Sequence, residues 1–321
     1  MHIWRFILTL VAALALVQHA TAQTYPDKSR IVRIIVPTGA SSSGDLQARA
    51  LARGMADVAG LNVIVENKAG AEGVIGMQAG KLAPPDGYTL VQGGTSTMVL
   101  NAVMLPNLAY DPVVDFVPVA GLSRFSLVLN TGPSLPFRTL REFIDDARRN
   151  PGKYSYASAS ATTRMAMEML ERQAGLKLLS VPFKTMAEAT TALAGGQVDL
   201  LMNDVATAVP FYQSGRLRPL AVTGAGRMYA IPDVPTLREQ GVADYELNGW
   251  FAMYFPANTP PALVAAMREI MVKASKTQYM ADVLKLASFE PLDLSPEQLG
   301  ALLRNDIDKW RTAARAAGAG K

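Results

Sequence analysis

The chain has 321 residues, of which 50% are hydrophobic, a formal net charge of +4 and no cysteine. This length suits one large domain or two of ordinary size, and the missing cysteines exclude a disulfide framework, a lipid-modified cysteine anchor and a thiol nucleophile. Basic and acidic residues alternate, and no basic run carries interleaved aromatics, so the charge gives no reason to expect a nucleic-acid partner.

The first 22 residues are predicted to be an export signal. Arg5 precedes a short apolar run from Phe6 to Val17, and Ala20-Thr21-Ala22 supplies the small residues of a cleavage site. The alternative is an amphipathic or membrane-spanning first helix, but the apolar run is shorter than the roughly 20 residues that a span requires. We therefore expect cleavage after Ala22 and a mature protein free in an exported compartment, most simply a bacterial periplasm.

Both histidines of the chain, His2 and His19, lie in the predicted signal. The mature protein would have neither imidazole nor thiol, which excludes a Ser-His-Asp triad and the usual zinc ligands. Carboxylate chemistry of the glycosidase kind stays open, since it needs only two acids. We expect a binding protein rather than an enzyme, with no cofactor and no metal.

Strand-like and helix-like segments then alternate along the chain. A strand is predicted at 31–36, and apolar residues at helical spacing follow it from Ala48 to Ala59. Next come a strand at 61–65, a helix at 73–82, a Pro-Pro-Asp-Gly turn at 84–87 and a strand at 88–92. This β-α-β-α-β order predicts a parallel sheet with helices on its faces.

The same alternation restarts with a predicted strand at 125–130. A capping box, Thr139 to Glu142, opens a helix that ends before Asn150. Further strands are predicted at 154–157, 178–181, 198–202 and 217–223, with helices at 162–174, 186–194, 205–214, 260–276 and behind Ser295.

Two such series predict an α/β protein with two lobes, although a single doubly wound domain is the alternative. Residues 23–124 and 248–321 would form one lobe and 125–247 the other, each a mostly parallel sheet flanked by helices. The chain is expected to return to the first lobe after the second is complete. It would then cross between the lobes near 122–126 and 247–250, where a hinge is predicted. A cleft is expected between the carboxyl ends of the two sheets.

A loop rich in hydroxyl groups and glycine, Thr38 to Asp45, lies between the first strand and its helix. The first N–H groups of a helix lack partners within it, and the helix dipole favours negative charge there. Asp45 stands where a phosphate loop would have its lysine, so a carboxylate suits this loop better than a phosphate. The alternative is that Ser43 or Asp45 only caps the helix.

A second hydroxyl-rich loop, Ser158 to Thr163, opens the helix that bears Arg164. Two such helix starts, one in each lobe, would hold the two ends of one acidic molecule. Arg164 is interpreted either as a countercharge for that ligand or as an ordinary solvated arginine.

Short motifs spread along the chain point to one family. They are Tyr25-Pro26-Asp27-Lys28, the run Val65-Glu66-Asn67-Lys68-Ala69-Gly70-Ala71-Glu72-Gly73-Val74-Ile75-Gly76, Pro85-Asp86-Gly87-Tyr88-Thr89-Leu90, Tyr110 to Phe116, Val181 to Lys184, Gly195 to Asp199, Pro232 to Thr236 and Trp250-Phe251. In this order they resemble the Bug family, the periplasmic solute receptors of tripartite tricarboxylate transporters. The resemblance covers nearly the whole mature chain.

The resemblance implies a two-lobed, type II periplasmic-binding-protein fold that closes on a small carboxylate and delivers it to membrane permease subunits. The ligand would be a di- or tricarboxylate, an aromatic carboxylate or an acidic amino acid, and the protein a monomer. A periplasmic sensor that docks on a signalling kinase is the alternative function. Carried over by position, the ligand-binding residues are Thr38, Gly39, Ala40, Ser41, Ser42, Ser43, Asp45, Thr95, Ser158, Ala159, Ser160, Thr162, Thr163, Arg164, Lys184, Thr185, Asn203 and Asp204.

The chain departs from the family pattern at several of these positions. The family usually has an aromatic near Thr38 and paired glycines near Ser41 and Ser42, its common Asp-Asn pair is inverted at 203–204, and the second loop is about two residues shorter than usual. Arg164 stands where a histidine is common. The carboxylate site would be preserved, and an arginine at the far side would favour a dicarboxylate over an amino acid.

Overall fold

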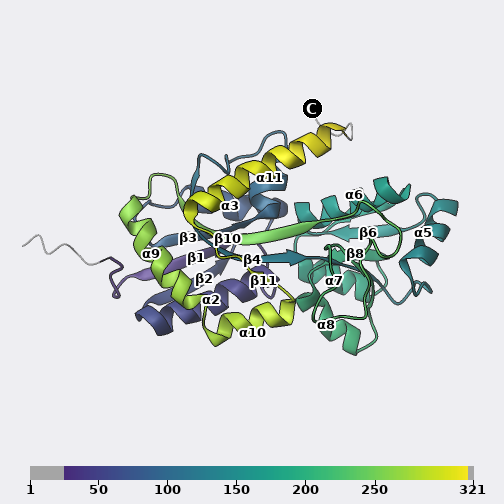
Figure 1. Cartoon of the computed structure of the whole chain (residues 1–321), viewed down its shortest axis with the longest axis horizontal. Coiled ribbons are helices and arrows are strands. Elements are labelled where there is room, and N and C mark those ends of the chain that lie inside the picture. The colour runs from purple at the N-terminus through teal and green to yellow at the C-terminus, as the bar shows by residue number, and fades with distance from the viewer. Residues whose placement is uncertain (1–24, 317–321) are drawn as a thin grey trace, which may run out of the picture.

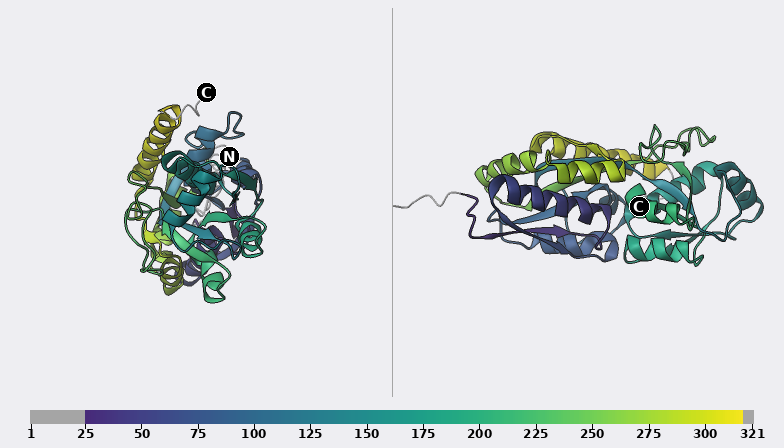
Figure 2. Two further views of the ribbon diagram at one scale, coloured as in Figure 1. Left: turned by 90° about the vertical axis from the view of Figure 1, so that its right-hand side faces the viewer. Right: turned by 90° about the horizontal axis from the view of Figure 1, so that it is seen from below.

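The computed structural model describes residues 25–316, and the predicted export signal with its cleavage after Ala22 lies outside them. Two sheets flanked by helices lie end to end along the long axis of the molecule (Figures 1 and 2). We refer to the part built on the first sheet as the first lobe and the part built on the second as the second lobe. The expected α/β fold with two lobes is thereby confirmed.

The first sheet has the strand order β11-β4-β10-β3-β1-β2. Its strands are β1 (Ile31–Val36), β2 (Asn62–Asn67), β3 (Thr89–Gly94), β4 (Phe116–Ser126), β10 (Asn248–Pro256) and β11 (Glu290–Pro291). β1 pairs in parallel with β2 and β3, whereas β10 runs antiparallel to β3 and β4. The helical elements of this lobe are α2 (Ser43–Ala59), η1 (Ala71–Gly73), α3 (Val74–Lys81), the π-helical η2 (Thr95–Leu100), α4 (Asn101–Met104), α9 (Pro261–Ala274), α10 (Gln278–Ala287) and α11 (Pro296–Ala316).

The second sheet has the order β7-β6-β8-β5-β9. Its strands are β5 (Val128–Thr131), β6 (Ser155–Ser158), β7 (Leu179–Pro182), β8 (Leu200–Asn203) and β9 (Arg218–Val222), and its helices are α5 (Leu140–Arg149), α6 (Ala161–Ala174), α7 (Met186–Ala194) and α8 (Val205–Gln213). β6 is parallel to β7 and β8, while β5 is antiparallel to β8 and β9. Each lobe therefore has parallel strands whose carboxyl ends lead into helices.

Local capping explains where several of these helices begin and end. Ser42 caps α2, its hydroxyl accepting a hydrogen bond from the Asp45 N–H, and the helix ends at Gly60 with φ 66°. Thr139 and Glu142 form the predicted capping box of α5. Because such contacts span only a few residues, the sequence pattern identified the α5 box without knowledge of the fold. The alternative that Ser43 or Asp45 caps α2 is wrong, because the capping hydroxyl is that of Ser42.

The predicted strand at 125–130 is wrong as a single strand. β4 ends at Ser126 and β5 begins at Val128, so Leu127 is the point where the chain passes from one sheet to the other. The apolar run continues through this crossing without glycine or proline, and periodicity alone cannot divide it. The sequence interpretation also missed β10 and α10.

Thr223 joins the two places where the chain passes between the sheets. Its hydroxyl accepts from the Leu127 N–H at 2.8 Å and donates to the Leu247 carbonyl at 2.8 Å. Its backbone bonds the same two residues. The Thr223 N–H donates to the Leu127 carbonyl at 2.9 Å, and the Thr223 carbonyl accepts from the Leu247 N–H at 3.0 Å. The threonine is fully buried, so both crossings are held at one point. Hinge motion there, and the lobe boundaries at 124/125 and 247/248, stay predictions.

The first-lobe core forms around β1 and β3. Val32, Ile34, Val36 and Leu90 have no exposed surface, as expected for parallel strands covered on both faces. α2 packs against α9 and α10, and α11 packs against β4 and η2. The loop that follows β1 is thus anchored at both ends by buried elements.

Candidate functional site

A cavity of about 100 Å³ lies between the two lobes. The connections that follow β1, β2 and β3 line it from the first lobe, and those that follow β6, β7 and β8 line it from the second. This is the expected place for a ligand site, since the carboxyl ends of parallel strands and the helix N-termini behind them converge there.

The first-lobe loop is held in shape by Asp45. The residue is 2% exposed, and its carboxylate accepts from the Ser41 N–H at 2.9 Å and the Asn67 amide at 2.9 Å and pairs with Arg49 at 2.9 Å. Burial acts to raise the pKa of Asp45, but these partners outweigh it and the pKa is lowered. Asp45 does not line the cavity, so its place in the structure is that of a charged support for the loop.

Two buried hydroxyls at the cavity have no partner within residues 25–316. One is Ser43 in the first turn of α2, 2% exposed, and the other is Thr162 in the first turn of α6, 3% exposed. Leaving a buried donor unpaired costs about 1–3 kcal/mol. Because both residues line the cavity, one from each lobe, they are available to a ligand.

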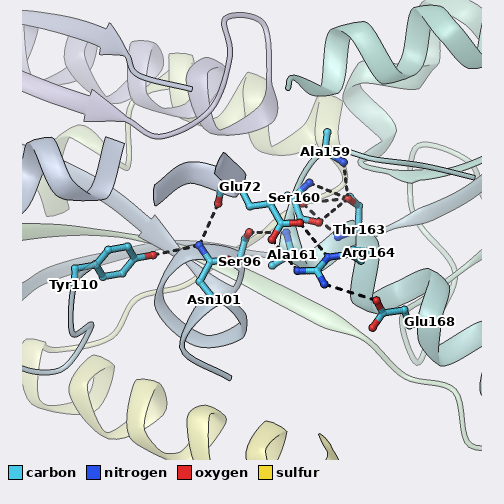
Figure 3. A network of polar contacts seen from close by, with 10 residues as sticks. All are labelled: Glu72, Ser96, Asn101, Tyr110, Ala159, Ser160, Ala161, Thr163, Arg164 and Glu168. Carbon is cyan, nitrogen blue, oxygen red and sulfur yellow. Dashed lines mark hydrogen bonds and ion pairs between the residues drawn. The ribbon is translucent and has the colours of Figure 1, made fainter. Parts of the chain in front are cut away.

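The second-lobe loop is shaped by a capping box and a contact across the cavity. The Ser160 hydroxyl caps α6 by accepting from the Thr163 N–H, and the Thr163 hydroxyl accepts from the Ala159 and Ser160 N–H groups at 3.2 Å. The Ala161 N–H donates to the Ser96 hydroxyl of the first lobe at 3.2 Å (Figure 3). Part of this wall is therefore held from the opposite lobe.

Asp204 is an acid in the cavity wall. It caps α8, its carboxylate accepting from the Thr207 N–H at 3.2 Å. Burial raises the pKa of Asp204, while the Ser43 hydroxyl lies near enough to oppose the rise. The distance and angle between the Ser43 hydroxyl and Asp204 complete no hydrogen bond, so this hydroxyl stays an unused donor.

An aromatic cluster forms the apolar part of the cavity. Ring centroids lie 4.8 Å apart between Phe125 and Phe251 and 5.3 Å apart between Phe125 and Phe289, and all three rings line the cavity with Leu127 and Met186. The motif Trp250-Phe251 drew attention to one of these residues, but no sequence signal joins three phenylalanines so far apart.

Arg164 departs from both sequence interpretations. Its guanidinium donates to both carboxylate oxygens of Glu72, at 3.0 and 2.9 Å, and lies 3.8 Å from Glu168 (Figure 3). It is neither free as a ligand countercharge nor simply solvated, and it is absent from the cavity lining, whereas Glu72 is part of that lining. Sequence reasoning missed Glu72 as a site residue, since its partner lies 92 positions away.

The structure brings together many of the predicted residues and leaves others aside. Those lining the cavity are Thr38, Gly39, Ser42, Ser43, Thr95, Ala159, Ser160, Thr162, Thr163, Lys184, Thr185 and Asp204. Those outside the lining are Ala40, Ser41, Asp45, Ser158, Arg164 and Asn203. Asn203 instead accepts from the Asn130 amide at 2.7 Å inside the second sheet. Their roles in binding stay predictions.

Residues 25–316 contain neither a metal-binding cluster nor a membrane-spanning helix. No group of three or more histidine, cysteine, aspartate or glutamate side chains could hold a metal ion there. Within the same residues, no helix is long and apolar enough to cross a membrane.

The two-lobed fold with a cavity between the lobes defines the class of periplasmic solute-binding proteins. The structure of the periplasmic binding protein BugD has 29% sequence identity, a TM-score of 0.87 and coverage of 92% of this chain and all of its own. The structure of R. palustris Rpa4515 with adipate has 28% identity and a TM-score of 0.87, covering 92% of this chain and 99% of that one. MatC from Rhodopseudomonas palustris with bound malate has 27% identity and a TM-score of 0.83, covering 88% and 98%.

The family described as tripartite tricarboxylate transporter family receptor matches residues 47–318. The chain belongs to this family, which confirms the resemblance drawn from the motifs. Among curated relatives, the protein BugT of Bordetella pertussis is 28% identical over 312 residues, covering 96% of this chain and 95% of its own length. A protein of Agrobacterium vitis is 33% identical over 297 residues, covering 91% and 83%.

Proposed function

We propose that the protein captures a small carboxylate between its lobes in the periplasm and delivers it to the permease subunits of a tripartite transporter. The observation that carries the proposal is the pair of unpartnered buried hydroxyls, Ser43 and Thr162, facing one cavity from two helix N-termini. A carboxylate is an acceptor-only group that would satisfy both hydroxyls at once.

The chemistry of the two helix starts supports an anion. The positive end of a helix dipole lies at each of them beside an unpartnered hydroxyl, so a carboxylate can be held without a side-chain cation. The negative charge of Asp45 is offset by its ion pair with Arg49 and by hydrogen bonds from the Asn67 amide and the Ser41 N–H. It therefore repels a ligand carboxylate at the first loop less than an unpaired charge would. Water bridges would complete the contacts that direct hydrogen bonds do not reach.

Family membership supports the same function. Relatives with adipate and with malate bound have the same fold, and the family is that of transporter receptors. The fold and family are those of binding proteins, which supports a role without catalysis. We further propose that the predicted signal directs export and that the mature protein is a monomer.

The test is calorimetry on the mature chain with short aliphatic carboxylates, supported by thermal unfolding. At 100 times its dissociation constant a ligand raises the free energy of unfolding by about 2.7 kcal/mol. Ser43→Ala and Thr162→Val should each lower affinity about ten- to a hundredfold, since a hydrogen bond to a charged group contributes about 1.5–3 kcal/mol.

The matched control is Ser214→Ala, which removes a hydroxyl from an exposed serine that is not part of the cavity. It should leave affinity unchanged. Wild-type affinity in both cavity variants, or no carboxylate binding by the wild type, would refute the proposed function.

A further inference from the structure

An ion pair joins the two lobes at the cavity. Glu72 belongs to η1 in the first lobe, and Arg164 lies in the first turns of α6 in the second. Nε and one terminal nitrogen of the guanidinium each donate to a different carboxylate oxygen, at 3.0 and 2.9 Å. The side chains are 25% and 26% exposed, so solvent screens this two-point pair only in part.

The backbone at Glu72 is unusual for a residue with a side chain. Ala71 and Glu72 have φ of 47° and 52°, in the left-handed region that non-glycine residues seldom adopt. The Asn101 amide donates to the Glu72 carbonyl at 3.2 Å and helps to hold this turn (Figure 3). A glycine would adopt this conformation more easily, so the carboxylate at this position points to a use for the side chain.

The charges around the cavity do little to favour a second ligand carboxylate. Its lining contains two acids, Glu72 and Asp204, and among the described lining residues Lys184 is the only basic one. Lys184 is an exposed residue, so solvent screens its charge. The guanidinium of Arg164, which sequence reasoning assigned to a distal carboxylate, is already occupied by Glu72.

The remaining surface of the cavity suits an uncharged group. Phe125, Phe251 and Phe289 form a contiguous aromatic wall. A second carboxylate placed against this wall would lose its hydration without gaining a donor, which is costly for a charge. An alkyl or aryl group placed there gains apolar contact.

We propose that Glu72 is the specificity-determining residue of the receptor: by occupying Arg164 it restricts the cavity to acids with one carboxylate and an apolar body. This inference rests on the proposed function, because it concerns the far end of the ligand whose carboxylate the two helix starts hold. It replaces the expectation from sequence that Arg164 favours a dicarboxylate.

The test uses matched acids that differ only at the far end, butanoate with succinate and hexanoate with adipate. Calorimetry on the mature wild type should give an affinity at least about tenfold higher for each monoacid than for its diacid. Glu72→Gln keeps the shape of the side chain but releases the guanidinium, so affinity for the diacids should rise about ten- to a hundredfold. The monoacids have no second carboxylate for the released guanidinium, so their affinity should rise by much less than that of the diacids.

Three further variants make the result specific. The double variant Glu72→Gln with Arg164→Gln should show no gain for diacids, since the gain requires a free guanidinium. Glu168→Gln removes the other carboxylate near Arg164, at 3.8 Å, and should leave the preference unchanged. Glu72→Gly serves if Glu72→Gln folds poorly, because glycine adopts the φ of 52° at this position without strain.

The outcomes separate this inference from the proposed function. A wild type that binds none of the four acids refutes the proposed function and the inference with it. A wild type that binds monoacids, with unchanged preference in Glu72→Gln and Glu72→Gly, overturns the inference alone. Equal wild-type affinity for monoacid and diacid, or the same gain in the double variant, also overturns it.

Discussion

The two walls of the cavity are built alike but held differently. Each is a hydroxyl-rich loop that opens a helix and presents one unpartnered buried hydroxyl, Ser43 or Thr162. The first-lobe loop is fixed by partners from its own lobe, through Asp45 and Asn67. The second-lobe wall takes part of its support from the first lobe, through Ala161 to Ser96 and Arg164 to Glu72.

This difference shows which wall depends on closure. The contacts of Asp45 persist whatever the distance between the lobes, so we expect the first-lobe loop to be preformed for the ligand. The cross-lobe contacts of the second wall exist only when the lobes meet. The first wall would then bind a carboxylate in the open and the closed form, whereas the second would add its contacts only in the closed form.

The largest expected effect comes from placing a charge on the preformed wall. Ser42→Asp should lower carboxylate affinity about a thousandfold, since two like charges 4 Å apart repel by about 4 kcal/mol at an effective dielectric constant of 20. The fold should persist because aspartate is a good N-cap and its charge is tolerated at a helix N-terminus. Calorimetry measures the loss, with circular dichroism as a check of folding.

Ser42→Asn is the matched control, because asparagine also caps a helix but carries no charge. It should keep most of the affinity. Equal binding by folded Ser42→Asp and wild type would mean that this loop is only a helix cap.

A smaller effect is expected where the two walls touch. A Cβ on Gly39 would lie 2.9 Å from Thr185 Cγ2 in the opposite lobe, and Thr185 cannot turn away freely because its hydroxyl caps α7. Gly39→Val should therefore hinder closure and lower affinity about tenfold, the usual scale of a steric clash of 1–3 kcal/mol. Small-angle scattering should show less compaction by saturating ligand than in the wild type.

Combining Gly39→Val with Thr185→Ser removes the methyl group in question and retains a capping hydroxyl. Closure and affinity should be partly restored. Full compaction in Gly39→Val alone would show that the lobes do not approach each other here during binding.

The smallest expected effect concerns the acid in the second wall. Because burial raises the pKa of Asp204 above its ordinary value of 3.8, the folded protein holds this proton where the unfolded chain has lost it. The free energy of unfolding should therefore decrease as pH rises from the unfolded pKa through the folded one, and the loss is complete above the latter.

Asp204→Asn keeps a capping side chain and removes this titration. Denaturant unfolding of both proteins between about pH 3 and pH 8 isolates the contribution, because the other acids cancel in the difference. The stability of the wild type relative to the variant should decrease with rising pH. A difference that is flat, or that increases with pH, would contradict the assigned environment of Asp204.

Local patterns in the sequence predicted much of the secondary structure and the positions of the two helix starts. The strand at 31–36 and the capping box of α5 depend on residues within a few positions of one another, and the structure has them where the pattern places them. The hydroxyl-rich loops were found for the same reason. The absence of histidine and cysteine from the predicted mature chain could likewise be established without knowing the fold, since it follows from composition alone. The cap of α2 was assigned one residue too late or more, since it is Ser42 and not Ser43 or Asp45.

Contacts between residues distant in sequence decided the rest. The Glu72–Arg164 pair spans 92 positions, and the aromatic wall joins Phe125, Phe251 and Phe289 from β4, β10 and the segment after α10. No periodicity or cap relates such residues, because their proximity arises from the packing of the lobes. Local sequence chemistry thus predicted where an anion would be held, whereas the meeting of the lobes determined that Arg164 faces Glu72 and that three phenylalanines share one cavity wall.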